Sequence, residues 1–160
     1  MIQLEVLRAD HSAPLYEFES RNREYFARTV PDRGDAFFAE FDRMFADRLA
    51  EQETGTIRMH VVVEDGEIVG RVNLVDVADG TAELGYRIGE SASGRGVATA
   101  AVKKVVEVAA TELGLSELRA ETTVDNPASQ AVLKRAGFTP VGETTLEGRP
   151  AIRYARPLRP

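Results

Sequence analysis

The sequence predicts an α/β fold of the α+β kind, with a mixed, mostly antiparallel sheet, one central parallel strand pair and flanking helices. Two β-branched runs, residues 57–63 and 68–77, are separated by Asp65-Gly66, a dipeptide typical of a tight hairpin turn. Farther along, residues 81–88 and 118–124 have strand character and are joined by a helical pattern. Because a crossover helix joins these two strands, we expect them to be parallel.

The N-terminal elements follow from hydrophobic periodicity. Residues 2–7 alternate between apolar and polar types, which predicts a half-buried strand, and a short helix is expected near residues 11–26. Residues 35–52 carry an apolar side chain at every fourth position, which predicts a second helix. That aromatic stripe could line a ligand pocket, but an apolar stripe at this period is the ordinary core face, and we favour packing. Its members are Phe37, Phe41, Phe45 and Leu49.

The C-terminal elements are delimited by turn residues. A turn at residues 78–80 leads into the strand at 81–88, and an amphipathic helix runs from Val97 until Gly114 ends it. Pro127 suits the first position of another short helix, which Gly137 ends. Two further strands, residues 139–145 and 150–155, complete the predicted sheet.

Length and composition limit the classes of function. The 160 residues are 43% hydrophobic, and no linker or repeat interrupts them, so residues 1–160 are expected to form a single domain. The chain has no cysteine, which excludes a cysteine acyl-enzyme. A net charge of −6 argues against nucleic acid as a partner. The lack of a long apolar run or leader pattern predicts no membrane partner and a cytoplasmic location.

A glycine-rich turn follows the strand at residues 81–88. The sequence Gly94-Arg95-Gly96-Val97-Ala98-Thr99 opens a helix, so its backbone N–H groups would lie at a positive helix end and could bind a phosphate group. Taken alone, the turn could equally be a plain strand-to-helix connection. A Walker-type loop is excluded because no Gly-Lys-Ser or Gly-Lys-Thr occurs. A dinucleotide motif is excluded because Thr99 stands where the third glycine is needed.

Residues 93–98 resemble the central signature of the GCN5-related N-acetyltransferase (GNAT) superfamily, Gln/Arg-x-x-Gly-x-Gly/Ala. Ser93 departs from that pattern at its first position. Residues 83–88 resemble the fourth strand of the family, residues 126–129 its Asn-x-x-Ser segment, and residues 134–138 its helix-ending Gly-Phe. Asn22-Arg23 is similar to a segment of the RimJ/RimL branch, which acetylates N-terminal amines of ribosomal proteins. The resemblance covers nearly the whole chain and implies a GNAT-type sheet whose central parallel strands splay apart.

The resemblance implies that acetyl-CoA is the cosubstrate and that its acetyl group passes directly to an amine. Backbone groups of the glycine-rich turn would hold the pyrophosphate, with added contributions from the Arg95 charge and the Thr99 hydroxyl. The strand before the turn would pair with the pantetheine arm, and an N–H near Arg87 or Ile88 is the oxyanion donor we expect. The predicted cofactor-binding residues are Tyr86, Arg87, Ile88, Gly94, Arg95, Gly96, Val97, Ala98, Thr99, Asn126 and Ser129.

Two residues are predicted to be catalytic. Ser129 is the candidate that would hydrogen-bond the CoA sulfur and return a proton, because Leu133 stands where many family members have a tyrosine acid. Asn126 either contacts the CoA arm or only caps the helix that follows it. Glu83 is the leading candidate for the general base, although it could be a solvated strand residue, and Glu121 is the second choice. Strand alternation places Glu83 on one face of the sheet and Tyr86 on the other, without saying which face borders the acceptor.

The acceptor is expected to be a peptide or protein N-terminal amine. Such an amine has a pKa of about 7.7–8.0 and is roughly one-tenth neutral at pH 7, so it needs less help from a base than a lysine with a pKa near 10.4. The alternatives are a small amine such as an antibiotic, polyamine or amino acid, transfer of another acyl group such as succinyl, and a CoA-binding module without activity. A homodimer is possible. No metal is expected, because His11 and His60 are too few and too far apart in sequence.

Overall fold

A computed structural model describes residues 1–158 and contains one seven-stranded sheet in the order β1-β2-β3-β4-β5-β7-β6. All neighbouring strands are antiparallel except β4 and β5, which confirms the predicted mixed sheet and its parallel pair. Asp65 and Gly66 both have positive φ in the tight turn between β2 and β3. The strands are β1 (Ile2–Val6), β2 (Arg58–Glu64), β3 (Glu67–Ala78), β4 (Thr81–Ile88), β5 (Glu117–Thr123), β6 (Thr139–Leu146) and β7 (Arg149–Pro157).

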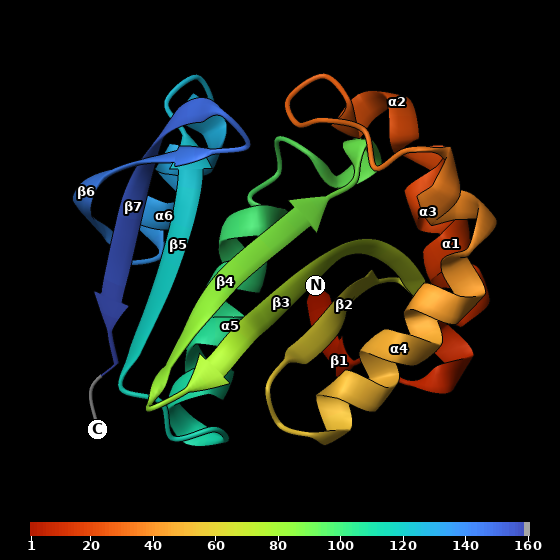
Figure 1. Ribbon diagram of the computed structural model, residues 1–160, viewed down its shortest axis with the longest axis horizontal. Coiled ribbons are helices and arrows are strands. Elements are labelled where there is room, and N and C mark those ends of the chain that lie inside the picture. The colour runs from red at the N-terminus through yellow and green to blue at the C-terminus, as the bar shows by residue number, and fades with distance from the viewer. Residues whose placement is uncertain (159–160) are drawn as a thin grey trace.

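The helices cover both faces of the sheet (Figure 1). One face carries α5, whose apolar side packs on the central strands and on α6 in the larger core. The other face carries the N-terminal helices, which enclose a second core around Phe18, Phe41 and Phe45. The α-helices are α1 (Ser12–Arg21), α2 (Arg23–Phe26), α3 (Asp35–Ala39), α4 (Phe41–Glu53), α5 (Val97–Thr111) and α6 (Pro127–Arg135). None of these helices is both long and apolar enough to cross a membrane, within the residues described.

Both predicted N-terminal helices are divided, which corrects the sequence expectation. The helix near residues 11–26 breaks at Asn22, whose side chain donates a hydrogen bond to the Phe18 carbonyl and competes with regular helix pairing. The helix at 35–52 breaks at Glu40, which has φ −112° and ψ 25°. Tertiary contacts with α2 hold the short α3 in place there, because the guanidinium of Arg23 lies over the Phe38 ring and pairs with Asp35.

The aromatic stripe is mainly core, as predicted. Phe41 and Phe45 are buried, and Phe37 and Leu49 pack against them while remaining partly exposed. Phe37 has a second surface that borders a cavity described below. Packing therefore accounts for the period of the stripe, and one end of it contributes to a possible ligand site.

The parallel strands β4 and β5 separate soon after they begin. Their pairing covers only Thr81–Glu83 against Glu117–Arg119, at the lower ends of the two strands in Figure 1. Above that point the strands diverge, while β3 stays paired with β4 as far as Ile88. The backbone of β4 after Glu83 therefore has an edge with no neighbouring strand, at the place where β4 leads into the glycine-rich turn.

Candidate active site

Two cavities lie around the divergence of β4 and β5. The first, here called the turn cavity, has a volume of about 640 Å³ and is bordered by the end of β4, the glycine-rich turn and the first turns of α6. The second, called the hairpin cavity, has a volume of about 690 Å³ and lies between residues 30–44 and the turn joining β6 to β7. Arg87 lines both cavities, so they meet at the end of β4.

Most of the predicted cofactor residues line the turn cavity. From β4 they are Tyr86, Arg87 and Ile88; from the glycine-rich turn, Gly94, Gly96, Val97, Ala98 and Thr99; from α6 and its start, Asn126 and Ser129. The remaining predicted residue, Arg95, is not among the lining residues.

The glycine-rich turn presents free backbone donors. Gly94 and Gly96 have φ values of 75° and 77°, and a Cβ atom on either would meet nothing within 4 Å. Glycine is therefore needed for the left-handed backbone and not for lack of space. Within residues 1–158, no group accepts a hydrogen bond from the N–H groups of residues 94–99. These N–H groups at the start of the 15-residue helix α5 suit an anion such as a pyrophosphate.

The Arg95 side chain is directed away from this cavity. Its guanidinium donates to both carboxylate oxygens of Glu64, at 2.8 and 3.1 Å, at the end of β2. This pairing lowers the pKa of Glu64, because the carboxylate accepts hydrogen bonds from a cation. In this arrangement only the backbone N–H of Arg95 is available to an anion at the turn, because its guanidinium pairs with Glu64 at the surface.

Asn22 fixes the start of the turn. Its side-chain oxygen accepts a hydrogen bond from the Glu90 N–H at 2.9 Å, and its amide nitrogen donates to the Phe18 carbonyl at 2.9 Å. Gly89 packs so closely here that a Cβ would lie 2.9 Å from the Phe18 ring. In the sequence, Asn22 stands out only as part of a segment similar to the RimJ/RimL branch. The structure shows that this buried amide ties α1 to the chain entering the glycine-rich turn.

Tyr86 and Ser129 meet inside the turn cavity. The Tyr86 phenol oxygen and the Ser129 Oγ are hydrogen-bonded at 2.7 Å, which joins β4 to α6 across the gap between the splayed strands. Burial raises the pKa of Tyr86, since the charged phenolate is poorly solvated there. From the sequence, only main-chain contacts are expected of Tyr86. Tyr86 lies two residues after the core residue Leu84 on the same strand, so the two side chains share a face of the sheet. This spacing is the sequence feature that indicates a Tyr86 side chain directed toward α6.

Asn126 caps α6, because its Oδ1 accepts a hydrogen bond from the Ser129 N–H at 3.2 Å. It also lines the turn cavity, so the capping role and a contact with the CoA arm are compatible. Leu133, in the position of the family tyrosine, is 1% exposed and packs in the larger core. The phenol that lies beside Ser129 in the turn cavity is that of Tyr86, from β4.

The sheet face toward the N-terminal helices carries Glu83 and Arg87, while Ala82 and Leu84 are buried against α5. Arg87, on the same face as Glu83, borders the hairpin cavity. Burial, assisted by the neighbouring Glu121 carboxylate, raises the pKa of Glu83. Neither Glu83 nor Glu121 lines either cavity, so any contact with an acceptor would pass through water.

The two histidines have structural surroundings. His11 contacts the Glu5 carboxylate and accepts the Arg8 N–H, while His60 is buried on β2 beside the Val72 carbonyl. Burial and the nearby Arg58 lower the pKa of His60 to about 4, so it is neutral at physiological pH. Across residues 1–158, no three His, Cys, Asp or Glu side chains cluster in a way that could hold a metal ion.

Family comparison agrees with this geometry. The profile of the acetyltransferase (GNAT) domain family matches residues 2–139, and the chain belongs to that family. It is accordingly an N-acetyltransferase that takes its acetyl group from acetyl-CoA. The free N–H groups and the size of the turn cavity fit the pyrophosphate and arm of that cosubstrate.

The chain is similar to several bacterial proteins. It is 31% identical over 143 residues to the probable N-acetyltransferase YjcK of Bacillus subtilis (strain 168), covering 84% of this chain and 77% of that protein. It is 24% identical over 140 residues to the ribosomal-protein-serine acetyltransferase of Escherichia coli (strain K12), covering 86% of this chain and 78% of that protein. The structure of ribosomal-protein-S5-alanine acetyltransferase from Vibrio fischeri matches with a TM-score of 0.90 at 19% identity, over 98% and 93% of the two chains. That match shows a shared fold.

Proposed function

We propose that this acetyltransferase acts on the N-terminal amine of a peptide or protein. The observation that carries the proposal is the junction of the two cavities at Arg87, because an amine entering through the hairpin cavity would approach the end of the turn cavity. The hairpin cavity is bordered by the loop before α3 and by the β6–β7 turn, and its size can accept a chain end. The names of two similar proteins, which act on ribosomal proteins, support the same acceptor class.

In this proposal the N–H groups of residues 94–99 bind the cosubstrate pyrophosphate, and the free edge of β4 binds the pantetheine arm. A backbone N–H near Arg87 or Ile88 donates to the thioester oxygen as it becomes an oxyanion. Asn126 borders the arm while it caps α6. The chain's own contribution is therefore to position the thioester at the mouth of the hairpin cavity.

Ser129 and Tyr86 return the proton to the leaving sulfur. The amine nitrogen attacks the thioester carbonyl, the new C–N bond forms, and the C–S bond breaks to give a thiolate. Ser129 donates a proton to that thiolate and receives one from Tyr86, whose raised pKa keeps the phenol protonated at neutral pH. Glu83, acting through water, accepts the proton that the amine loses. Its raised pKa makes it a better base than an ordinary exposed carboxylate.

A thiol-release assay tests the function. Acetyl-CoA is supplied with short peptides that carry free or blocked N-termini, and with a spermidine, amino acid and aminoglycoside panel. We expect CoA release with free N-termini and none with blocked ones. Turnover limited to a small amine would replace the proposed acceptor, and cofactor binding without turnover of any amine would indicate a binding module. Competition with succinyl-CoA tests the choice of acyl group.

We also propose a cytoplasmic enzyme that can form a homodimer. Strand β6 lies at the sheet edge, and Val141 on it is 57% exposed, which gives a second copy a place to contact. Sedimentation velocity over a range of protein concentrations measures the assembly state. A concentration-independent monomer would remove the dimer from the proposal.

A further inference from the structure

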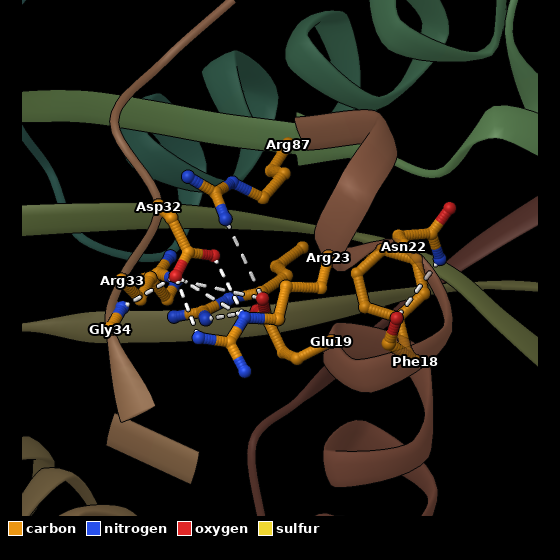
Figure 2. Close-up of polar contacts among 9 residues, drawn as sticks. Phe18, Glu19, Asn22, Arg23, Asp32, Arg33, Gly34 and Arg87 are labelled. Atoms are coloured by element: carbon orange, nitrogen blue, oxygen red, sulfur yellow. Dashed lines mark hydrogen bonds and ion pairs between the residues drawn. The ribbon is translucent and has the colours of Figure 1, made fainter. Parts of the chain in front are cut away.

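Three arginine side chains converge on one buried carboxylate beside the hairpin cavity. Glu19 on α1 is 1% exposed in its side chain, and Arg71 from β3 donates to it at 2.6 Å. Arg33 from the loop before α3 and Arg87 from β4 each lie 3.5 Å from its other oxygen. Figure 2 shows Arg33 and Arg87 approaching Glu19 from different elements. These four residues are called the arginine cluster.

The arginine cluster has more positive than negative charge. Asp32 lies nearby, but two guanidinium nitrogens of Arg23 donate to it and balance its charge (Figure 2). Arg23 also pairs with Asp35, whose side chain is 97% exposed, so that second carboxylate is screened by solvent. One carboxylate therefore faces three guanidinium groups, which leaves two positive charges in excess. Burial, together with the charges of Arg71 and Arg87, lowers the pKa of Arg33 to about 10. The cluster favours the binding of a further anion, because three guanidinium groups share the single carboxylate of Glu19 and repel one another.

The excess charge faces the site where the acceptor would bind. Arg33 and Arg87 both line the hairpin cavity, and Arg87 also borders the turn cavity. The other cations of the hairpin cavity have partners, since Arg43 pairs with Glu40 and Arg149 pairs with Asp125. Two other carboxylates line the cavity. Asp32 is held by Arg23, and Glu147 is exposed on the β6–β7 turn and is screened by solvent.

We propose that the arginine cluster selects acceptors that carry a carboxylate close to the reacting amine, bound by Arg33 with help from Arg87. A guanidinium group can donate two parallel hydrogen bonds to a carboxylate, which gives both affinity and orientation. The carboxylate is either an acidic side chain in the first two residues of a peptide or the α-carboxylate of a free amino acid. This inference rests on the proposed function, and it makes polycationic amines poor acceptors, because they would add positive charge beside Arg33 and Arg87.

The test compares matched acceptors with the full-length protein and acetyl-CoA. The peptides share one sequence except for Asp, Asn or Lys at the second position, and free amino acids are compared with the corresponding amino acid amides. We expect kcat/KM for the Asp peptide to exceed that for the Asn peptide by about tenfold or more, mainly through KM, with the Lys peptide poorest. If free amino acids have a higher kcat/KM than every peptide, and the corresponding amides are poor acceptors, the group bound by the arginine cluster is the α-carboxylate.

Variants assign the preference to the cluster. Arg33→Gln should reduce the Asp-to-Asn ratio toward one, because the KM of the Asp peptide should rise more than that of the Asn peptide. Arg48→Gln removes the same charge from an exposed residue of α4 paired with Glu51, and should keep the ratio. Should Arg33→Gln fail to fold, Arg33→Lys retains the positive charge and should preserve the order of the peptides with a smaller ratio.

The outcomes separate this inference from the proposed function. Equal kcat/KM for the Asp and Asn peptides, or a preference for Lys, overturns the carboxylate site while peptide acetylation stands. A ratio that persists in Arg33→Gln also overturns it. If no peptide is acetylated but amino acids are used well and their amides poorly, the peptide function fails and the carboxylate site stands.

Discussion

The phenol of Tyr86 and the hydroxyl of Ser129 are hydrogen-bonded at 2.7 Å across the opening between β4 and α6. The two residues are 43 positions apart in the chain and meet only because the strands β4 and β5 splay. A serine alone is a weak acid, and in the proposed mechanism the phenol behind it supplies the proton that the serine gives away. The pair would then take the place of the single family tyrosine, whose position Leu133 occupies.

Replacement of both hydroxyls tests whether they act as one unit. We expect Tyr86→Phe and Ser129→Ala each to lower kcat by about tenfold to a hundredfold, the lower part of the range for proton transfer by a positioned group. The double variant should be little worse than either single one, because a relay fails when either member is lost. Steady-state kinetics and acetyl-CoA titration measure the effects. Additive losses, or a loss expressed only in acetyl-CoA affinity, would show two independent binding contacts.

Gly96 gives a matched test of the pyrophosphate site. Its φ is 77°, so Gly96→Ala strains the backbone by about 1–2 kcal/mol and places a methyl group where the anion approaches. Gly55→Ala is the control, since Gly55 has φ 83°, similarly open space and a position outside both cavities. Both variants should lose similar stability in urea unfolding. Only Gly96→Ala should weaken acetyl-CoA binding, by about tenfold or more, and equal affinities in the two variants would refute the site.

The parts of this protein that follow from local sequence were predictable. Turn dipeptides and period-two runs predict β2, β3 and β4 to within about two residues, and the spacing of Gly94 and Gly96 locates the glycine-rich turn. The contacts made across the fold were not. The Glu19 carboxylate pairs with arginines from three other segments. Glu19 and Arg71 are 52 positions apart in the sequence, and no local pattern links residues at that separation. The position of Glu83 outside both cavities likewise depends on where the strands begin to splay.

Glu83 should give activity and stability opposite dependences on pH. Burial and the charge of Glu121 raise the pKa of Glu83 above its ordinary value of 4.5. The folded protein therefore binds a proton here more tightly than the unfolded chain, so its stability decreases as pH rises through the folded pKa. Activity, which needs the ionised base, should increase over the same range. The acidic limb of kcat/KM should thus lie above pH 4.5.

Two glutamine variants locate the base. Glu83→Gln should remove the acidic limb, lower kcat and slightly stabilise the protein at neutral pH, because it removes a buried carboxylate with a raised pKa. Glu121→Gln should keep the limb but move it to lower pH, since the neighbouring negative charge is gone. The pH–rate profiles and urea unfolding at matched pH values measure these effects. Loss of the limb in Glu121→Gln alone would transfer the role to that residue.

Asn22 should support cofactor binding without touching the cofactor. It does not line the turn cavity, yet its amide joins the Phe18 carbonyl to the Glu90 N–H at the entrance to the glycine-rich turn. Asn22→Ala leaves the Glu90 N–H without its acceptor, while the Phe18 carbonyl still accepts the backbone N–H of residue 22 at 3.1 Å. The variant should cost about 1–3 kcal/mol of stability and should weaken acetyl-CoA binding by loosening the turn. Urea unfolding and calorimetric titration with acetyl-CoA give the two quantities separately.

Gln52 provides the control for this distinction. Its side-chain amide likewise joins two backbone groups, donating to the Leu7 carbonyl at 3.0 Å and accepting from the Met59 N–H at 2.7 Å, on the opposite side of the N-terminal core from the turn. Gln52→Ala should lose a similar amount of stability and keep its affinity for acetyl-CoA. If both variants lose affinity in proportion to their stability, general loosening of the fold explains the effect. A loss of affinity confined to Asn22→Ala assigns the positioning of the turn to this one amide.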